Sequence, residues 1–526
     1  MSATTTTFRR GILIALGGAL ATTACATTAP QPAPTTPPSS AAAPIATQAP
    51  ASVAAAPSTP DAPFRAEAPA PGPDPQFAMP AFKHFKLKNG LEVILAEFHD
   101  LPLVDLNLFV KSGGGANPAD LAGLSEMTAN MLDEGTATRS ALQIAEEIAS
   151  LGATLGTGSS WDASTLTLST LTKNFDAGLA IWADVLQNPK FDEREFKRVR
   201  DNVLTAITRR KDSPPTVASL ALARVLYGAR HPYGWPQSGV EETLKKVTIP
   251  DLKAFYDAHY RPNNAVLIVA GDITEAALRS KLEPALKSWK PKKIVARKLP
   301  VPATAAAGGK TRIHLIDKAE APQSSIRVGL IGIERLNPDY YPITLMNLIL
   351  GGGFYRLDLN LREGRGWTYG ARSSFDSRKT PGPFSAGGEF VAPRSADSVA
   401  EIIKEINTIR DSDVTDAELA RAKDQIIKSF PARFATRGAV VNQLAEIAVY
   451  GLPDNYLAEY TRKIAAVGKD DVRRVARRYL DPTKLTIIVV GDQKSLRDAL
   501  AKIAPVELRD LDANVVPSGE PAAKQD

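Results

Sequence analysis

The side chains that could bind a metal or act as a nucleophile are few and widely spaced. The chain has a single cysteine, Cys25, which excludes an internal disulfide and a cysteine-based zinc site. No Gly-x-Ser-x-Gly motif occurs either, so the sequence gives no support to a self-sufficient serine or cysteine hydrolase. No two of the five histidines lie within five positions, so none forms a helical pair of metal ligands; they are His84, His99, His231, His259 and His314.

A repeat at an offset of 220 residues organises the chain. His259–Asp272 matches Tyr479–Asp492, with Pro262 aligned to Pro482 and each copy ending in Gly-Asp. Both copies read as helix, turn, buried strand, Gly-Asp turn and helix. We therefore expect two homologous halves, 82–297 and 311–516, joined by a Pro- and Ala-rich linker at 298–310.

Within each half, strands and long helices are expected to alternate. Asn89-Gly90 between apolar runs indicates a hairpin, and 103–110 and 163–171 read as strands. Amphipathic helices are expected over 191–211 and 215–228. This mixture predicts an α+β fold in which helices pack on a largely antiparallel sheet.

One segment carries a specific resemblance: Gly123-Leu-Ser-Glu-Met-Thr-Ala-Asn-Met-Leu-Asp-Glu-Gly-Thr136. It resembles the signature Gly-x-Ala-His-x-x-Glu-His-Met-x-x-x-Gly-Thr of the M16 peptidases (pitrilysin, insulysin and mitochondrial processing peptidase). The resemblance extends over nearly all of 84–510 and includes the architecture of two halves. It implies that the chain forms half of a clam-shell chamber.

In active members of that family, His-x-x-Glu-His supplies two zinc ligands and a base, and a later glutamate supplies a third ligand. In this chain those positions are Glu126, Ala129, Asn130 and Ala206. Both imidazoles, the base and the distal carboxylate are missing. We therefore expect no zinc and no complete catalytic site on this chain. The acidic pair Asp133-Glu134 is expected to face solvent.

The second half resembles another M16 signature, over 350–370. In the family, an arginine and a tyrosine seven residues apart grip the substrate backbone, and Arg362 and Tyr369 match them. Taken alone, these residues favour a local ion pair of Arg362 with Asp358 or Glu363 and a Tyr369 packed in a strand, whereas the whole signature favours the binding role. Gly351–Gly353 is not followed by a phosphate-binding Lys-Ser/Thr, and we expect it to let the backbone turn sharply near a ligand.

The N-terminal 81 residues read as an export signal and a tether. Arg9 and Arg10 precede a short apolar run, so 1–25 fits a signal peptide in which Cys25 is the candidate for lipidation. Residues 26–81 are rich in Ala, Pro and Thr and are expected to be disordered, as is the tail 517–526. We therefore expect an exported, periplasmic protein of a Gram-negative bacterium. The position of Cys25 favours a lipid anchor at the membrane. Because Thr22 departs from the usual lipoprotein pattern, the alternative is a plain signal peptide without an anchor.

The resemblance and the missing residues together favour a non-catalytic, peptide-binding subunit whose zinc-bearing partner carries His-x-x-Glu-His. The alternative is an M16-fold peptide-binding or scaffold protein without a proteolytic role. The formal net charge is +6, but the basic residues are spread along the chain, which argues against nucleic acid as a partner.

Overall fold

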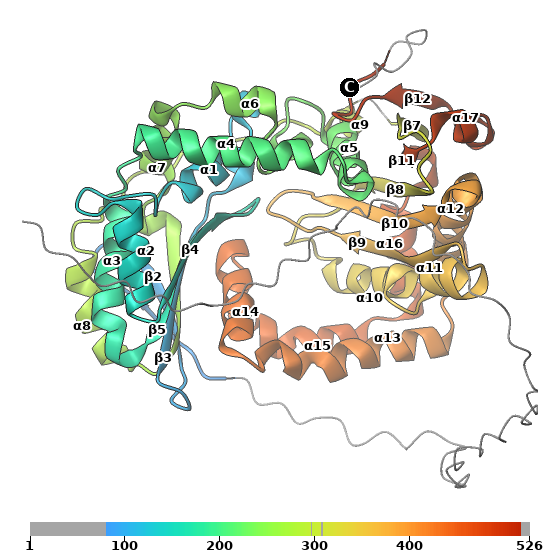
Figure 1. Cartoon of the computed structure of the whole chain (residues 1–526). Helices are drawn as coiled ribbons and strands as arrows, with labels where there is room; N and C mark the ends of the chain where they lie inside the picture. The colour runs from blue at the N-terminus through green and yellow to red at the C-terminus, as the bar shows by residue number, and fades with distance from the viewer. Residues whose placement is uncertain (1–79, 296, 307–308, 517–526) are drawn as a thin grey trace, which may run out of the picture. The chain divides into compact units, whose positions relative to one another are not determined.

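The computed structural model describes residues 80–295, 297–306 and 309–516. In this part of the chain two six-stranded, mostly antiparallel sheets each carry a set of helices (Figure 1). The expected α+β fold of two homologous halves is confirmed. Formation of a clam-shell chamber needs a second subunit and stays a prediction.

The first sheet has the strand order β1-β2-β6-β3-β5-β4. Strands β1 and β2 form the expected hairpin, whose turn uses Gly90 at φ +87°. Strand β6 pairs parallel to β2 and antiparallel to β3. Strand β4 pairs with β5 alone and forms one edge of the sheet. The strands span Lys83–Lys86 (β1), Glu92–Glu97 (β2), Leu103–Val110 (β3), Thr154–Ser159 (β4), Ser164–Leu171 (β5) and Ala265–Gly271 (β6).

The second sheet has the order β12-β7-β11-β8-β10-β9 and repeats this topology in all strands except the edge strand β12, which pairs parallel to β7 whereas β1 pairs antiparallel to β2. Strand β11 pairs parallel to β7 and antiparallel to β8, as β6 does with β2 and β3. Strand β9 is therefore the counterpart of β4 at the equivalent edge. The strands span Arg312–Asp317 (β7), Gln323–Ile331 (β8), Thr368–Phe375 (β9), Pro383–Val391 (β10), Thr486–Gly491 (β11) and Val506–Arg509 (β12).

The helices follow the predicted repeat. Helix α7 (Ile249–His259) and helix α16 (Lys469–Tyr479) begin and end at the expected offset. The other helices of the first half are α1 (Leu124–Asn130), α2 (Ala141–Ser150), α3 (Phe175–Gln187), α4 (Glu193–Arg210), α5 (Pro214–Tyr227), α6 (Glu241–Lys246) and α8 (Glu275–Ala285). Those of the second half are α10 (Tyr340–Gly351), α11 (Arg356–Asp358), α12 (Ser395–Asp411), α13 (Asp416–Ser429), α14 (Arg437–Tyr450), α15 (Tyr456–Ala466) and α17 (Gln493–Ala501).

The halves exchange helices across their sheets. Helix α5 of the first half packs on β8 and β11, and helix α14 of the second half packs on β6 (Figure 1). Each central strand is thus covered on both faces, which explains why β6 and β11 are continuous apolar runs. The contact is close: a Cβ at Gly329 on β8 would lie 2.7 Å from a methyl carbon of Leu222.

A buried carboxylate also joins the halves. Asp162, which follows β4, accepts hydrogen bonds from the Tyr450 hydroxyl at 3.1 Å and the Lys379 backbone N–H at 3.1 Å. Tyr233 of its own half lies against the same carboxylate. Loss of a buried hydrogen-bond partner leaves polar groups unsatisfied, which costs free energy. These hydrogen bonds therefore stabilise the contact between the two halves.

The predicted signal peptide 1–25 with Cys25, nearly all of the tether 26–81 and the tail 517–526 lie outside the described residues. Most of the predicted linker is described, and Ala303–Ala306 (α9) forms one helical turn beside α5. No helix in the described segments is long and apolar enough to cross a membrane.

Candidate functional site

The positions equivalent to a zinc site lie on two neighbouring helices. Glu126 and Asn130 on α1 are half-buried, whereas Ala129 between them is 0% exposed. Helix α1 packs against α7, strand β4 and helix α4. Ala206 on α4 is exposed, in a shallow depression that Arg209 and Arg210 also line.

These residues do not fit a zinc ion. Glu126 is the only one of the four positions with a ligand atom suited to zinc, and an asparagine amide is a poor substitute for an imidazole. Burial raises the pKa of Glu126, and the charge of Arg210 acts in the opposite direction. That arginine would repel a cation held there. Within the described ranges, no group of three or more His, Cys, Asp or Glu side chains is arranged to hold a metal.

The acidic pair that follows α1 is not solvent-facing as predicted. Glu134 is half-buried and forms an ion pair with Arg198 of α4. Asp133 is also half-buried, and burial raises its pKa to about 6 although Thr157 hydrogen-bonds to it. The sequence-based expectation failed because α4 and β4, which are distant in the sequence, pack over the end of α1.

Asp133→Asn is expected to stabilise the protein at pH 7.5 and to change little at pH 4. The folded-state pKa lies above that of the unfolded chain, so the stability contributed by Asp133 is present below pH 4 and is lost as the pH rises through 6. The expected gain in the free energy of unfolding at pH 7.5 is about 1–3 kcal/mol. Urea denaturation at the two pH values measures it.

The exposed Asp120→Asn variant is the matched control, because it removes one carboxylate from the same region without a burial penalty. A gain for Asp133→Asn that is equal at both pH values would contradict the burial argument.

The histidines do not converge, in agreement with their spacing. His231 is buried among Tyr227 and Tyr233, and burial lowers its pKa to about 4. His314 is buried near Glu507 and Arg509, and its pKa is likewise lowered to about 4 by burial. His99 is exposed and pairs with Asp272 at 2.7 Å. These histidines pack or pair locally.

The Arg/Tyr pair lies at the edge of the second sheet. Arg362 is in the π-helical segment Leu359–Gly364, and Tyr369 is the second residue of edge strand β9. The tyrosine is 92% exposed, which excludes the alternative in which it packs within the sheet. The Arg362 side chain is 38% exposed, so part of its guanidinium is open to a ligand.

The local ion pairs proposed as the alternative for Arg362 are present but long. Its Nη1 lies 3.5 Å from Asp358 Oδ2, and its Nε lies 3.4 Å from Glu363 Oε1. Asp358 is 1% exposed and accepts a hydrogen bond from the Phe354 N–H at 3.2 Å. Asp358 thus positions Arg362 relative to the preceding loop. In the sequence, only the spacing of four residues between Asp358 and Arg362 indicates this role.

The glycines before this pair serve both close packing and a turn. A Cβ at Gly351 would lie 2.2 Å from the Ser373 nitrogen of β9, so glycine allows α10 to approach the strand. The positive φ in this loop belongs to Phe354, at +62°. The predicted turn is present, because the Tyr355 N–H donates a hydrogen bond to the Gly352 carbonyl at 3.1 Å across the two intervening residues. Its approach to a ligand stays a prediction.

A cavity of about 620 Å³ lies on the sheet face beside Tyr369. Small residues of β10 form its floor, including Ser385, Gly387 and Gly388. Arg372, which is exposed, and Arg327, which pairs with Glu389 at 2.9 Å, stand at its sides. Sequence reasoning missed these side chains because they come from strands that meet only in the folded sheet.

Comparisons with known proteins agree with this geometry. Residues 92–231 match the family model "Insulinase (Peptidase family M16)" and residues 246–426 match "Peptidase M16 inactive domain". A solved structure described as a peptidase M16 inactive domain from Pseudomonas fluorescens superimposes with a TM-score of 0.72 at 28% identity, covering 78% of this chain and 98% of that one.

Curated relatives include both zinc proteases and a non-peptidase. The "Uncharacterized zinc protease YmxG" of Bacillus subtilis is 24% identical over 75% of this chain and 95% of its own length. The "Non-peptidase homolog YmxG" of Helicobacter pylori is 24% identical over 76% of this chain and 92% of its own length.

Proposed function

Because the chain belongs to the M16 peptidase family, we propose that it is the non-catalytic, substrate-binding subunit of a zinc-dependent M16 peptidase. One observation carries this proposal. The positions of the zinc ligands and of the base hold Glu126, Ala129, Asn130 and Ala206, whereas the positions of the substrate-gripping pair hold Arg362 and Tyr369.

The exposure of the pair supports a role in binding peptides. Arg362 offers a rigid fork of N–H donors to peptide carbonyls, and the Tyr369 hydroxyl offers a donor to an oxyanion that develops on the substrate. Both side chains have surface open to a ligand. The zinc, its ligands and the base would come from the partner subunit that carries His-x-x-Glu-His.

The second candidate is a peptide-binding or scaffold protein with no proteolytic role. The description of the Helicobacter pylori relative as a non-peptidase homologue favours it. The intact Arg/Tyr signature favours the first candidate over a scaffold, which has no evident need for a substrate grip, but it fits a peptide-binding protein as well.

The proposal extends to the place of action. The apolar run after Arg9 and Arg10, followed by Cys25, supports export and attachment to the membrane by a lipid. The substrates would then be peptides in the periplasm or at the membrane surface.

The test is to measure zinc content and peptide hydrolysis of the mature chain, alone and mixed with an M16 protein that carries His-x-x-Glu-His. We expect no stoichiometric zinc and no hydrolysis for the chain alone. We expect hydrolysis on mixing that exceeds that of the partner by itself.

Two outcomes would count against the proposal in different ways. Chelator-sensitive hydrolysis by the isolated chain would mean that it is itself a metallopeptidase. Tight binding of peptides with no stimulation of any M16 partner encoded in the same genome would favour the scaffold.

A further inference from the structure

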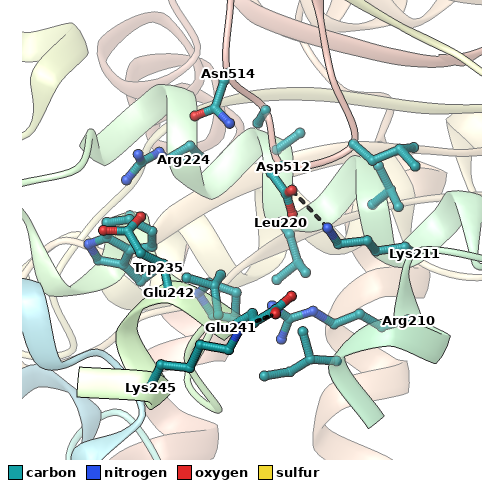
Figure 2. A pocket seen from close by; sticks show the side chains of 18 residues that line it. Arg210, Lys211, Leu220, Arg224, Trp235, Glu241, Glu242, Lys245, Asp512 and Asn514 are labelled. Atoms are coloured by element: carbon teal, nitrogen blue, oxygen red, sulfur yellow. Dashed lines mark hydrogen bonds and ion pairs between the residues drawn. The ribbon is translucent and has the colours of Figure 1, made fainter. Parts of the chain in front are cut away.

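A second cavity lies apart from the Arg/Tyr pair. It has a volume of about 460 Å³ and is lined by helices α4, α5 and α6 together with the segment Leu511–Asn514 (Figure 2). This volume falls within the range of small-molecule sites. Helices α4 to α6 and the segment Leu511–Asn514 are more than 200 residues apart in the sequence, so no local pattern predicted the cavity.

Apolar side chains form one part of the cavity wall. They come from three separate parts of the chain, so the wall is shaped by tertiary packing. These side chains are Ile207, Val217, Leu220, Ala221, Leu511 and Ala513. A hydrocarbon body that enters the cavity would exchange water for these contacts, which is favourable in proportion to the area buried.

An arginine that lacks a hydrogen-bond partner for one of its nitrogens lies at the same cavity. Arg224 of α5 lies over the Trp235 ring at 4.0 Å, and the indole is held in turn by its N–H bond to the Ala229 carbonyl at 2.8 Å. The Nη1 of Arg224 is buried and has no hydrogen-bond partner. Because a buried donor without a partner costs free energy, this nitrogen indicates an acceptor that the protein itself does not supply.

The carboxylates at the cavity form their ion pairs with other cations, although Glu242 also attracts Arg224 electrostatically. Lys211 pairs with Asp512 at 2.8 Å, and Lys245 pairs with Glu241 at 2.6 Å. Glu242 pairs at 2.6 Å with Lys246, which lies outside the lining.

Arg210 donates to the Ser238 hydroxyl and the Gly239 carbonyl and, like Arg224, forms no ion pair with a carboxylate of the described residues. Figure 2 shows Arg224 with Trp235 on one side of the cavity and Arg210 with Lys211 on the other. The four cations and three carboxylates that line the cavity leave a formal charge of +1, which suits one monoanion.

We propose that this cavity binds an apolar monocarboxylate, a molecule with one carboxylate and a hydrocarbon body, whose carboxylate is held by Arg224. The planar fork of arginine suits a carboxylate, and one negative charge matches the uncompensated charge better than a phosphate dianion would. Trp235 holds the guanidinium flat, so little side-chain entropy is lost on binding. The site is separate from the Arg/Tyr pair and does not depend on the proposed function.

The test is a calorimetric titration of the whole mature chain with decanoate, at concentrations below those at which decanoate forms micelles. We expect saturable binding at one site, weakened by about ten-fold or more in Arg224→Gln, the loss expected for one hydrogen bond to a charged group. 1-Decanol, which has the same chain without the charge, should bind more weakly by a similar factor. Binding of decanoate should also weaken as salt is added.

Two further variants keep the test decisive. Leu220→Trp narrows the cavity without changing its charge and should abolish binding, whereas Arg497→Gln, which removes an exposed arginine on α17, should leave binding unchanged. Thermal denaturation of each variant shows whether it folds. If Arg224→Gln does not fold, the results with Leu220→Trp and with 1-decanol still test the proposal.

The proposal is overturned if decanoate shows no saturable binding, if 1-decanol binds equally well, or if decanoate binds folded Arg224→Gln or Leu220→Trp as tightly as the unaltered chain.

Discussion

Arg362→Ala is expected to lower peptide turnover by the complex of this chain with a zinc-bearing partner by about 10- to 100-fold. The reason is the loss of a charge-assisted hydrogen bond to the substrate, which contributes about 1.5–3 kcal/mol. Assembly of the complex should not change, because the side-chain contacts of Arg362 are two long ion pairs and a contact with the Phe354 ring at 5.5 Å, all within its own half. Steady-state hydrolysis gives the turnover, and size-exclusion chromatography gives the assembly.

Tyr369→Phe isolates the contribution of the hydroxyl. The side chain is 92% exposed, so the substitution removes one donor and should leave stability unchanged. Arg394→Ala is the matched control for Arg362, since it removes another exposed arginine of the same half, which pairs with the exposed Asp397 and lies 5.7 Å from the Trp367 ring. Turnover of Arg362→Ala and Tyr369→Phe equal to that of Arg394→Ala would remove the proposed role in substrate binding.

Ala129→Glu, which restores the residue type of the catalytic base, is expected to lower the free energy of unfolding by about 3 kcal/mol or more. The position is 0% exposed, so the larger side chain must displace its neighbours and bury a carboxylate without a partner. Ala206→Glu is the same substitution at the distal ligand position. It lies on the exposed face of α4 beside Arg209 and Arg210, so we expect it to change stability by less than about 0.5 kcal/mol.

Urea denaturation of the two variants measures this difference. If Ala129→Glu were as stable as Ala206→Glu, the buried environment of position 129 would be wrongly assigned. The combined Glu126→His and Asn130→His variant, which restores both imidazoles without either glutamate, should bind zinc weakly at most and hydrolyse no peptide. Hydrolysis by that variant would contradict the assignment of the base.

Much of the fold was predictable from local patterns. The boundaries of β3 and the offset between α7 and α16 agree with the sequence-based prediction, because alternation and buried runs are set by which neighbouring residues are apolar. The continuous apolar runs of β6 and β11 indicated strands covered on both faces. Which helices cover them was not predictable, since α5 and α14 each cross to the sheet of the other half.

The same distinction between local patterns and tertiary packing holds for the candidate site. Whether a position can bind zinc or accept a proton depends first on its residue type. The amino-acid sequence alone therefore determined that positions 129 and 206 lack that chemistry, that Asn130 is a poor ligand, and that Glu126 is a single carboxylate. It also determined the match of Arg362 and Tyr369 to a substrate-gripping pair.

Only the tertiary structure decided how these residues are surrounded. It buries Ala129, raises the pKa of Asp133, exposes Tyr369 and leaves the Nη1 of Arg224 without a hydrogen-bond partner beside a cavity. The physical reason is that burial, pKa and hydrogen bonding depend on groups brought close by packing, most of them far away along the chain. Residue types and spacing are local properties, and the sequence alone contains them.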